Sequence, residues 1–189
     1  MPITNDIKLF LQFLSDAITE YVKELNQIKT IDSWMNLSKN VLAFLIVFNR
    51  RREGEVSKLE LKTYTLKPNY EEMETDTFFQ TLTPTEQYLC KNYSYMSTVG
   101  KRHRRVPIVF PHLIEDALNS LVENRESCGI KTNNKFLFAN SVLNYIRGCD
   151  ALRELVDKCK VFYKLQKPQL IRSTKLRKHV AAIAQILGS

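Results

Sequence analysis

Three short basic stretches follow one another along this sequence, and each carries side chains suited to binding phosphate. They occupy residues 50–55, 100–107 and 174–179. Arginine can bind a phosphate group through two parallel hydrogen bonds, whereas lysine binds it as a compact point charge. The residue types of the three stretches therefore suit contact with phosphate groups.

The charge of the chain also favours an anionic partner. The 189 residues carry a formal net charge of +8, and basic side chains that neutralise phosphates release condensed counterions on binding. Residues 158–189 hold eight lysines and arginines and no aspartate or glutamate. This concentration of charge predicts contact with nucleic acid or with an acidic membrane surface.

Composition narrows the class of protein further. With 44% hydrophobic residues, the chain is long enough for one domain with its own core. No stretch approaches the roughly 20 apolar residues of a membrane span, and the first residues lack the apolar run of a signal peptide. We therefore expect a nuclear or cytoplasmic protein that is not secreted. The four cysteines form no CxxC pair and have no zinc-like spacing with the histidines, so they are expected to be reduced thiols.

Hydrophobic periodicity predicts a mostly helical chain. Apolar residues recur at helical spacing over 7–28, and a second helix, capped at Asp32-Ser33, ends with the nearly all-apolar stretch 41–48. The alternating pattern of 59–64 is typical of a strand, and 65–82 has the composition of a loop. Further elements are predicted as a helix over 83–91, strands over 93–98 and 105–110, a helix from 113 that stops near Gly129, a short buried element at 136–138, a helix around 151–156, and a final helix that begins near Ser173 or Thr174. The expected fold class is α+β, mainly α, with a small antiparallel sheet.

Each basic stretch also has an ordinary interpretation when it is considered alone. Arginines after an apolar helix are typical of a solvated helix end, and a basic turn between strands is typical of a soluble hairpin. His179 is expected to be a plain surface or core histidine. In the third stretch, however, a basic first helical turn opposes the helix dipole unless an anion is bound there.

Taken together, the three stretches resemble the catalytic domain of the tyrosine recombinases, the phage-integrase family. Residues 52–55 match the family's Arg-x-Gly-Glu pattern, and 100–107 resembles the basic hairpin of Crypton-like and related animal mobile elements. Residues 174–178 match the family's His-x-Leu-Arg-His pattern with Arg177 at the arginine. The similarity extends through 82–86 and 145–153, and it covers roughly residues 33–187.

This resemblance implies DNA strand breakage and rejoining, as in site-specific recombination or integration, on double-stranded DNA and without metal or cofactor. Arg52 and Arg177 would stabilise charge on the phosphate, and Lys101 would act as the general acid, with Arg102 and Arg104 as stand-ins. Glu55 would orient the Arg52 guanidinium group. A homo-oligomer on DNA also fits the resemblance. Further DNA contacts are expected from Arg50, Arg51, Arg102, Arg104, Arg105, Lys175 and Lys178.

Two departures from the family pattern limit this expectation. Thr174 stands where the family has a histidine, and the last tyrosine of the sequence is Tyr163, so no nucleophile follows Arg177. We therefore expect an amino-terminal helical segment over 1–32, followed over 33–189 by a recombinase-like domain that is incomplete at its carboxyl end and inactive alone. A domesticated, non-catalytic DNA-binding or regulatory module is the alternative. A helical scaffold whose arginines bind acidic proteins is a more distant one.

Overall fold

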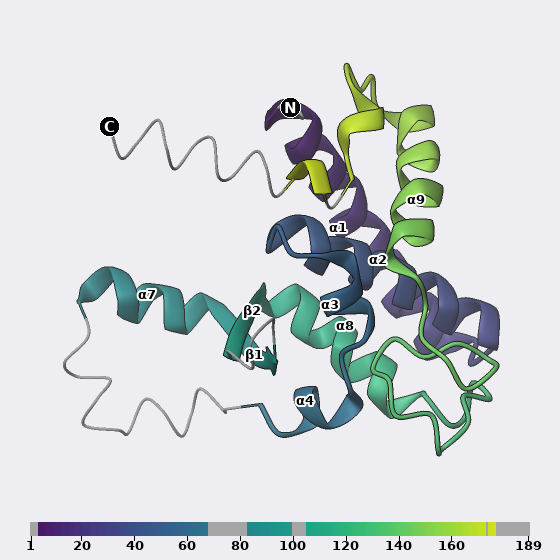
Figure 1. Ribbon diagram of the computed structural model, residues 1–189. Coiled ribbons are helices and arrows are strands. Elements are labelled where there is room, and N and C mark those ends of the chain that lie inside the picture. The colour runs from purple at the N-terminus through teal and green to yellow at the C-terminus, as the bar shows by residue number, and fades with distance from the viewer. Residues whose placement is uncertain (1–3, 68–82, 100–104, 173, 177–189) are drawn as a thin grey trace.

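The computed structural model describes residues 4–67, 83–99, 105–172 and 174–176, which are mainly helical (Figure 1). Within these ranges the expected fold class, mainly α with a small antiparallel sheet, is confirmed. The helices are α1 (Thr4–Gln27), α2 (Ile31–Phe48), α3 (Glu53–Ser57), α4 (Leu61–Thr65), α7 (Pro84–Asn92), α8 (His112–Glu123) and α9 (Gly148–Phe162), with a 3₁₀ turn at Pro168–Leu170. The two strands are β1 (Tyr93–Val99) and β2 (Arg105–Pro111).

Helix α2 forms the centre of the core because its second half is almost entirely apolar. Residues 41–47 are all buried, and helices α1, α8 and α9 pack around them. The helical spacing of the first residues is confirmed by α1, whose Phe10 and Leu14 are fully buried. At the other end of α2, Trp34 donates its Nε1–H to the carbonyl oxygen of Leu121 in α8 at 2.9 Å. These contacts hold α2 against α1, α8 and α9.

Helix α2 begins earlier than the predicted cap at Asp32-Ser33. The N-cap residue is Thr30, whose hydroxyl oxygen accepts a hydrogen bond from the backbone N–H of Ser33 at 3.2 Å. The Ser33 hydroxyl oxygen accepts in turn from the backbone N–H of Thr30, also at 3.2 Å. Serine therefore completes a capping box from the third helical position, and the predicted location of the cap is wrong.

The strand predicted over 59–64 is also wrong. Glu60 forms only an isolated antiparallel bridge with Phe136, and the next five residues form α4. The buried Tyr64 hydroxyl donates to the backbone oxygen of Glu115 and to Oδ1 of Asn119 in α8. Contacts with α8 therefore override the local alternation. Most of the predicted loop, 68–82, lies outside the described residues.

The predicted hairpin is confirmed over its two strands. They pair antiparallel from Tyr93 opposite Pro111 to Val99 opposite Arg105, directly after α7. Their buried side chains, Met96, Ile108 and Phe110, face the helices. The turn at 100–104 lies outside the described residues.

Helix α8 ends at Glu123, six residues before the predicted stop at Gly129. The chain continues in turns, and Gly129 has the left-handed backbone expected of it, with φ of 82°. The buried Arg125 donates to the carbonyl oxygens of Asn134 and Leu137, which holds the following loop against the end of α8. Because these bonds require turns at 124–129, the helix cannot extend to the glycine.

Helix α9 confirms the helix predicted around 151–156, and Leu152 and Leu155 are buried in the core. In the short element predicted at 136–138, Leu137 and Phe138 are buried as well. No helix within the described ranges has both the length and the apolar composition required to cross a membrane.

Candidate functional site

The first basic stretch forms a tight turn between α2 and α3, which we call the arginine turn (residues 49–52). The backbone N–H of Arg50 donates to the oxygen of Val47 at 3.4 Å, and that of Arg51 donates to the oxygen of Ile46 at 3.2 Å. This is a Schellman pattern, in which glycine usually occupies the left-handed position. Here Arg50 occupies it, with φ of 53°. A non-glycine residue in this conformation costs about 1–2 kcal/mol, and such strain is concentrated at functional sites.

The arginine turn is attached directly to strand β2. The Asn49 side-chain amide donates to the backbone oxygen of Val109 at 2.8 Å and accepts from the Val109 N–H at 2.8 Å. Two residues closer to the hairpin turn, the backbone oxygen of Pro107 accepts from Nη2 of Arg51 at 3.3 Å. The arginine turn and strand β2 are therefore linked through three hydrogen bonds, of which the one from Arg51 to Pro107 joins the first basic stretch to the second.

The guanidinium groups of the turn are only partly satisfied by the protein. Arg50 Nη1 and Arg51 Nε are buried without a hydrogen-bond partner among the described residues. Burial also lowers the pKa of the Arg50 guanidinium from its ordinary value. The Nη1 of Arg52 lies 3.8 Å from Oε1 of Glu55. Because the Arg52 side chain is 49% exposed, this ion pair is weak and leaves other N–H groups of Arg52 open to a ligand.

A cavity of about 590 Å³ lies between α9 and the carboxyl-terminal segment, and its wall reaches the first residue of α3. Its lining includes Glu53, the residue after Arg52, together with α9 and residues of the carboxyl-terminal segment up to Thr174. The first and third basic stretches therefore border one cavity although they lie far apart in the sequence. The wall carries three cationic side chains and two carboxylates, namely Arg153, Lys160, Arg172, Glu53 and Asp157.

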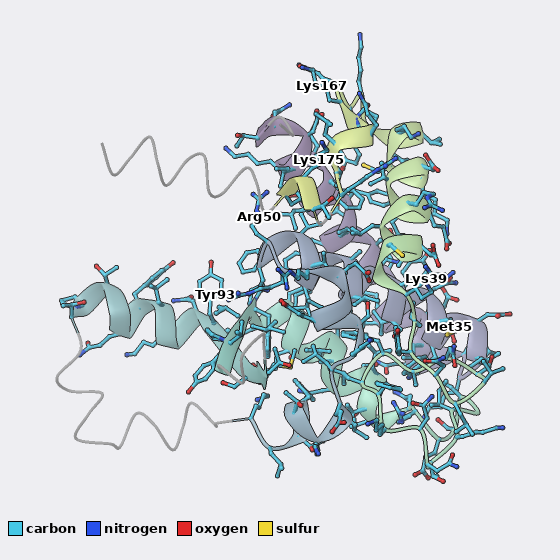
Figure 2. All side chains as sticks on the ribbon, viewed as in Figure 1. Met35, Lys39, Arg50, Tyr93, Lys167 and Lys175 are labelled. Atoms are coloured by element: carbon cyan, nitrogen blue, oxygen red, sulfur yellow. The ribbon has the colours of Figure 1, made fainter. Side chains whose placement is uncertain are left out.

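The described part of the third stretch, residues 174–176, belongs to a segment that is fixed to the core, which we call the carboxyl-terminal arm (residues 166–172 and 174–176). The buried Asp6 of α1 accepts hydrogen bonds from the backbone N–H groups of Gln166 at 3.0 Å and Lys167 at 2.7 Å. Lys167 and Lys175 mark the two ends of the arm in Figure 2. At the second end, residues 174–176 are helical and Leu176 is fully buried. This agrees with the predicted start of the final helix.

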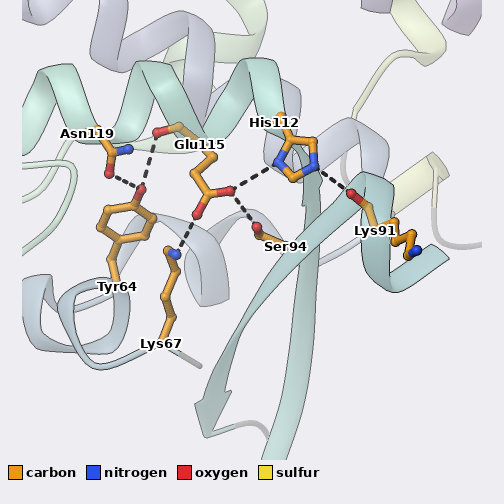
Figure 3. A network of polar contacts seen from close by, with 7 residues as sticks. All are labelled: Tyr64, Lys67, Lys91, Ser94, His112, Glu115 and Asn119. Carbon is orange, nitrogen blue, oxygen red and sulfur yellow. Dashed lines mark hydrogen bonds and ion pairs between the residues drawn. The ribbon is translucent and has the colours of Figure 1, made fainter. Parts of the chain in front are cut away.

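A second polar cluster attaches strand β1 of the hairpin to the helices, and we call it the Glu115 network (Figure 3). The Glu115 carboxylate accepts from the Ser94 hydroxyl at 2.5 Å, forms an ion pair with Lys67, and lies 3.4 Å from Nδ1 of His112. Burial acts to raise the pKa of Glu115, but these partners outweigh it and the pKa lies below its ordinary value. The network also includes Tyr64, Asn119 and the backbone oxygen of Lys91.

The predicted site residues are placed only in part. Those described with their side chains, namely Arg50, Arg51, Arg52, Glu55 and Lys175, lie at the arginine turn, on α3 and on the arm. Arg105 is described in its backbone, at the first position of β2. Lys101, Arg102, Arg104, Arg177 and Lys178 lie outside the described residues. Convergence of Arg52, Lys101 and Arg177 on one phosphate therefore stays a prediction.

Sequence reasoning missed the residues that hold these stretches in place. Asn49 and Asp6 act through backbone partners that lie far away in the chain. Gly148 lies where α9 meets α2 and α3, and a Cβ atom there would lie 2.6 Å from Cδ1 of Ile46 and 2.8 Å from Oγ of Ser57. A glycine at the start of a predicted helix was the one local signal that a close approach occurs.

No family model, curated protein or solved structure matches this chain. The described residues also contain no group of three or more histidine, cysteine, aspartate or glutamate side chains that could hold a metal ion. The chemistry of the site must therefore be argued from the arrangement of its cations.

Proposed function

We propose that this chain is a DNA-binding domain of the tyrosine-recombinase kind, which holds backbone phosphates of duplex DNA at the arginine turn. The observation that carries the proposal is the incomplete hydrogen bonding of Arg50 Nη1 and Arg51 Nε among the described residues. A buried polar group without a partner costs about 1–3 kcal/mol. A phosphate group offers several acceptor oxygens, and in the proposal these accept hydrogen bonds from the Arg50 and Arg51 guanidinium groups.

The backbone of the turn supports the same interpretation. A solvated helix end would be more stable with glycine at the position of Arg50, whose φ is 53°. Arginine at this strained position is explained if its side chain binds a ligand. The three hydrogen bonds to β2 also hold the turn in one conformation, which reduces the entropy lost when an anion binds.

The cavity supports an extension of the site to the third stretch. Because Glu53 and Thr174 line the same cavity, the proposal places Arg177, three residues after Thr174, near Arg52 at one phosphate. In this arrangement Arg52 and Arg177 stabilise the charge of the phosphate, Glu55 orients Arg52, and Lys101 on the hairpin protonates a leaving oxygen. The sequence has no tyrosine after Tyr163, so strand breakage and rejoining would need a tyrosine from elsewhere.

The proposal is tested by fluorescence anisotropy with a labelled duplex over a series of salt concentrations. If about five phosphates are engaged, log affinity should fall against log salt with a slope near −4 to −5. Replacing Arg52→Ala should lower the affinity about tenfold or more, since a charge-assisted hydrogen bond contributes about 1.5–3 kcal/mol.

The control is Lys62→Ala, which removes an exposed positive charge on α4, away from the arginine turn, where Lys62 pairs with Glu60. This control should leave the affinity almost unchanged. Equal losses in the two variants, or an affinity that does not respond to salt, would contradict binding at the arginine turn.

A further inference from the structure

The side chain of Asn49 occupies the place of a neighbouring strand at the outer edge of β2. Its amide group bonds to both the N–H and the oxygen of Val109, each at 2.8 Å. A neighbouring residue in an antiparallel ladder would make the same two bonds. The amide also donates to the oxygen of Leu45 in the last turn of α2 at 3.1 Å. Asn49 therefore connects the end of α2 to the hairpin through a single side chain.

The two residues after Asn49 depend on this connection. Arg50 adopts the left-handed backbone that reverses the chain, and Arg51 then donates to the oxygen of Pro107 on the same strand. Val109 and Pro107 are two residues apart, so both face the same edge of β2. The turn and the strand are thus aligned along an edge rather than joined at one point.

We infer that Asn49 is a positioning residue that fixes the arginine turn against the outer edge of β2 in its phosphate-binding conformation. This inference rests on the proposed function and deepens it, because it assigns the fixed placement of the arginine turn on β2 to one uncharged side chain. Only a side chain with a donor and an acceptor at its end can make both bonds to Val109, and an asparagine amide has both.

The inference is tested with Asn49→Ala in the full chain. The salt slope of duplex binding should become shallower by about 0.9 for each phosphate that the variant no longer neutralises, and affinity should fall about tenfold. Asn134→Ala is the matched control, because Asn134 also bonds to backbone groups, at Phe136 and Asn144, but within the loop after α8. This control should unfold more easily than the unchanged chain and yet keep its salt slope.

Two further measurements test the inference even if Asn49→Ala does not fold. Asn49→Asp keeps an acceptor for the Val109 N–H, loses the donor for the Val109 oxygen and adds a negative charge beside Arg50 and Arg51, so its affinity for duplex DNA should fall at least as far as that of Asn49→Ala. In the unchanged chain, hydrogen exchange at the Val109 amide should be about 100-fold or more slower than in an unstructured peptide. Fast exchange at this amide would overturn the inference.

The outcomes separate the inference from the function on which it rests. If the unchanged chain does not bind duplex DNA, the proposed function fails and the inference fails with it. If the unchanged chain binds and Asn49→Ala keeps the same salt slope as Asn134→Ala, the inference alone is overturned. A shallower slope in Asn49→Ala and not in Asn134→Ala supports it.

Discussion

Two polar regions attach the hairpin of β1 and β2 to the helices, and they differ in how far their charged groups have partners within the protein. In the Glu115 network, one carboxylate is met by the Lys67 ammonium, the Ser94 hydroxyl and the His112 ring. In the arginine turn, three successive guanidinium groups have one carboxylate partner among the described residues, at 3.8 Å from Arg52. The first arrangement satisfies its charges internally, whereas the second leaves capacity for an external anion.

The difference shows how a structural charge can be distinguished from a ligand-binding charge in the same fold. Both regions contain half-buried ionisable groups, so burial alone does not separate them. The pKa of Glu115 is lowered because its partners stabilise the charged form, whereas burial lowers the pKa of Arg50 and so disfavours its charged form. A group that is charged, partly buried and poorly compensated is a candidate for binding.

The largest expected effect on stability comes from removing the centre of the Glu115 network. Glu115→Ala leaves the largely buried Lys67 ammonium and the Ser94 hydroxyl without their shared acceptor, so the free energy of unfolding should fall by about 2 kcal/mol. Urea denaturation followed by circular dichroism measures this change. The salt slope of DNA binding should stay the same, and a change of slope in this variant would remove the distinction between the two regions.

A smaller effect of opposite sign is expected at the arginine turn. Arg50→Gly relieves the left-handed strain, and after the extra freedom of glycine in the unfolded chain is subtracted, the protein should be stabilised by about 0.5–1 kcal/mol. The same variant should bind duplex DNA about tenfold more weakly, because one charge-assisted hydrogen bond is removed. Thermal unfolding and anisotropy measure the two changes.

Leu143→Gly is the control for this prediction, because Leu143 also has a left-handed backbone, with φ of 62°, and lies exposed in the loop before α9. It should gain similar stability and keep its DNA affinity. If Arg50→Gly gains stability without losing affinity, Arg50 is only a strained helix end.

The smallest effect concerns the pH dependence of the Glu115 network. The hydrogen bond from His112 to the backbone oxygen of Lys91, at 2.7 Å, and the nearby Glu115 carboxylate raise the pKa of His112 above its ordinary value of 6.5. The folded protein therefore holds this proton more tightly than the unfolded chain. Its contribution to stability is full below pH 6.5 and is lost as the pH rises through the raised pKa.

His112→Gln should remove this part of the pH dependence. The free energy of unfolding of the variant, measured by urea denaturation at a series of pH values, should change less between weakly acidic and weakly alkaline conditions. A pH profile identical to that of the unchanged chain would show that His112 does not gain its partner on folding.

Elements with a regular local pattern were predictable from the sequence. The long run of apolar residues at helical spacing predicted α1, and the two alternating stretches around a basic turn predicted the hairpin. The apolar residues between Ala151 and Val156 predicted α9. The strand prediction for 59–64 was wrong because the alternating pattern was outweighed by the contacts of Tyr64. Its hydroxyl forms hydrogen bonds with residues of α8. Short apolar runs such as this one take the conformation that distant contacts select.

The charged residues of the candidate site were predictable from the sequence, whereas the residues that hold them in place were not. The basic residues and the Arg52–Glu55 pair can be identified from residue types and spacing. The bonds of Asn49 to Val109 and of Asp6 to the arm join segments that are far apart in the chain, so no local pattern reveals them. The left-handed backbone of Arg50 was hidden for another reason, since sequence rules reserve that position for glycine.

The most direct test of the central claim is an NMR titration that follows the arginine Nε–H signals as duplex DNA is added. Arg125 is the internal reference, because it is also buried but already donates to the oxygens of Asn134 and Leu137. Phosphate binding at the arginine turn predicts that the signals of Arg50 and Arg51 shift on titration while that of Arg125 stays in place. If the duplex binds and the Arg50 and Arg51 signals do not move, the arginine turn is not the phosphate-binding site.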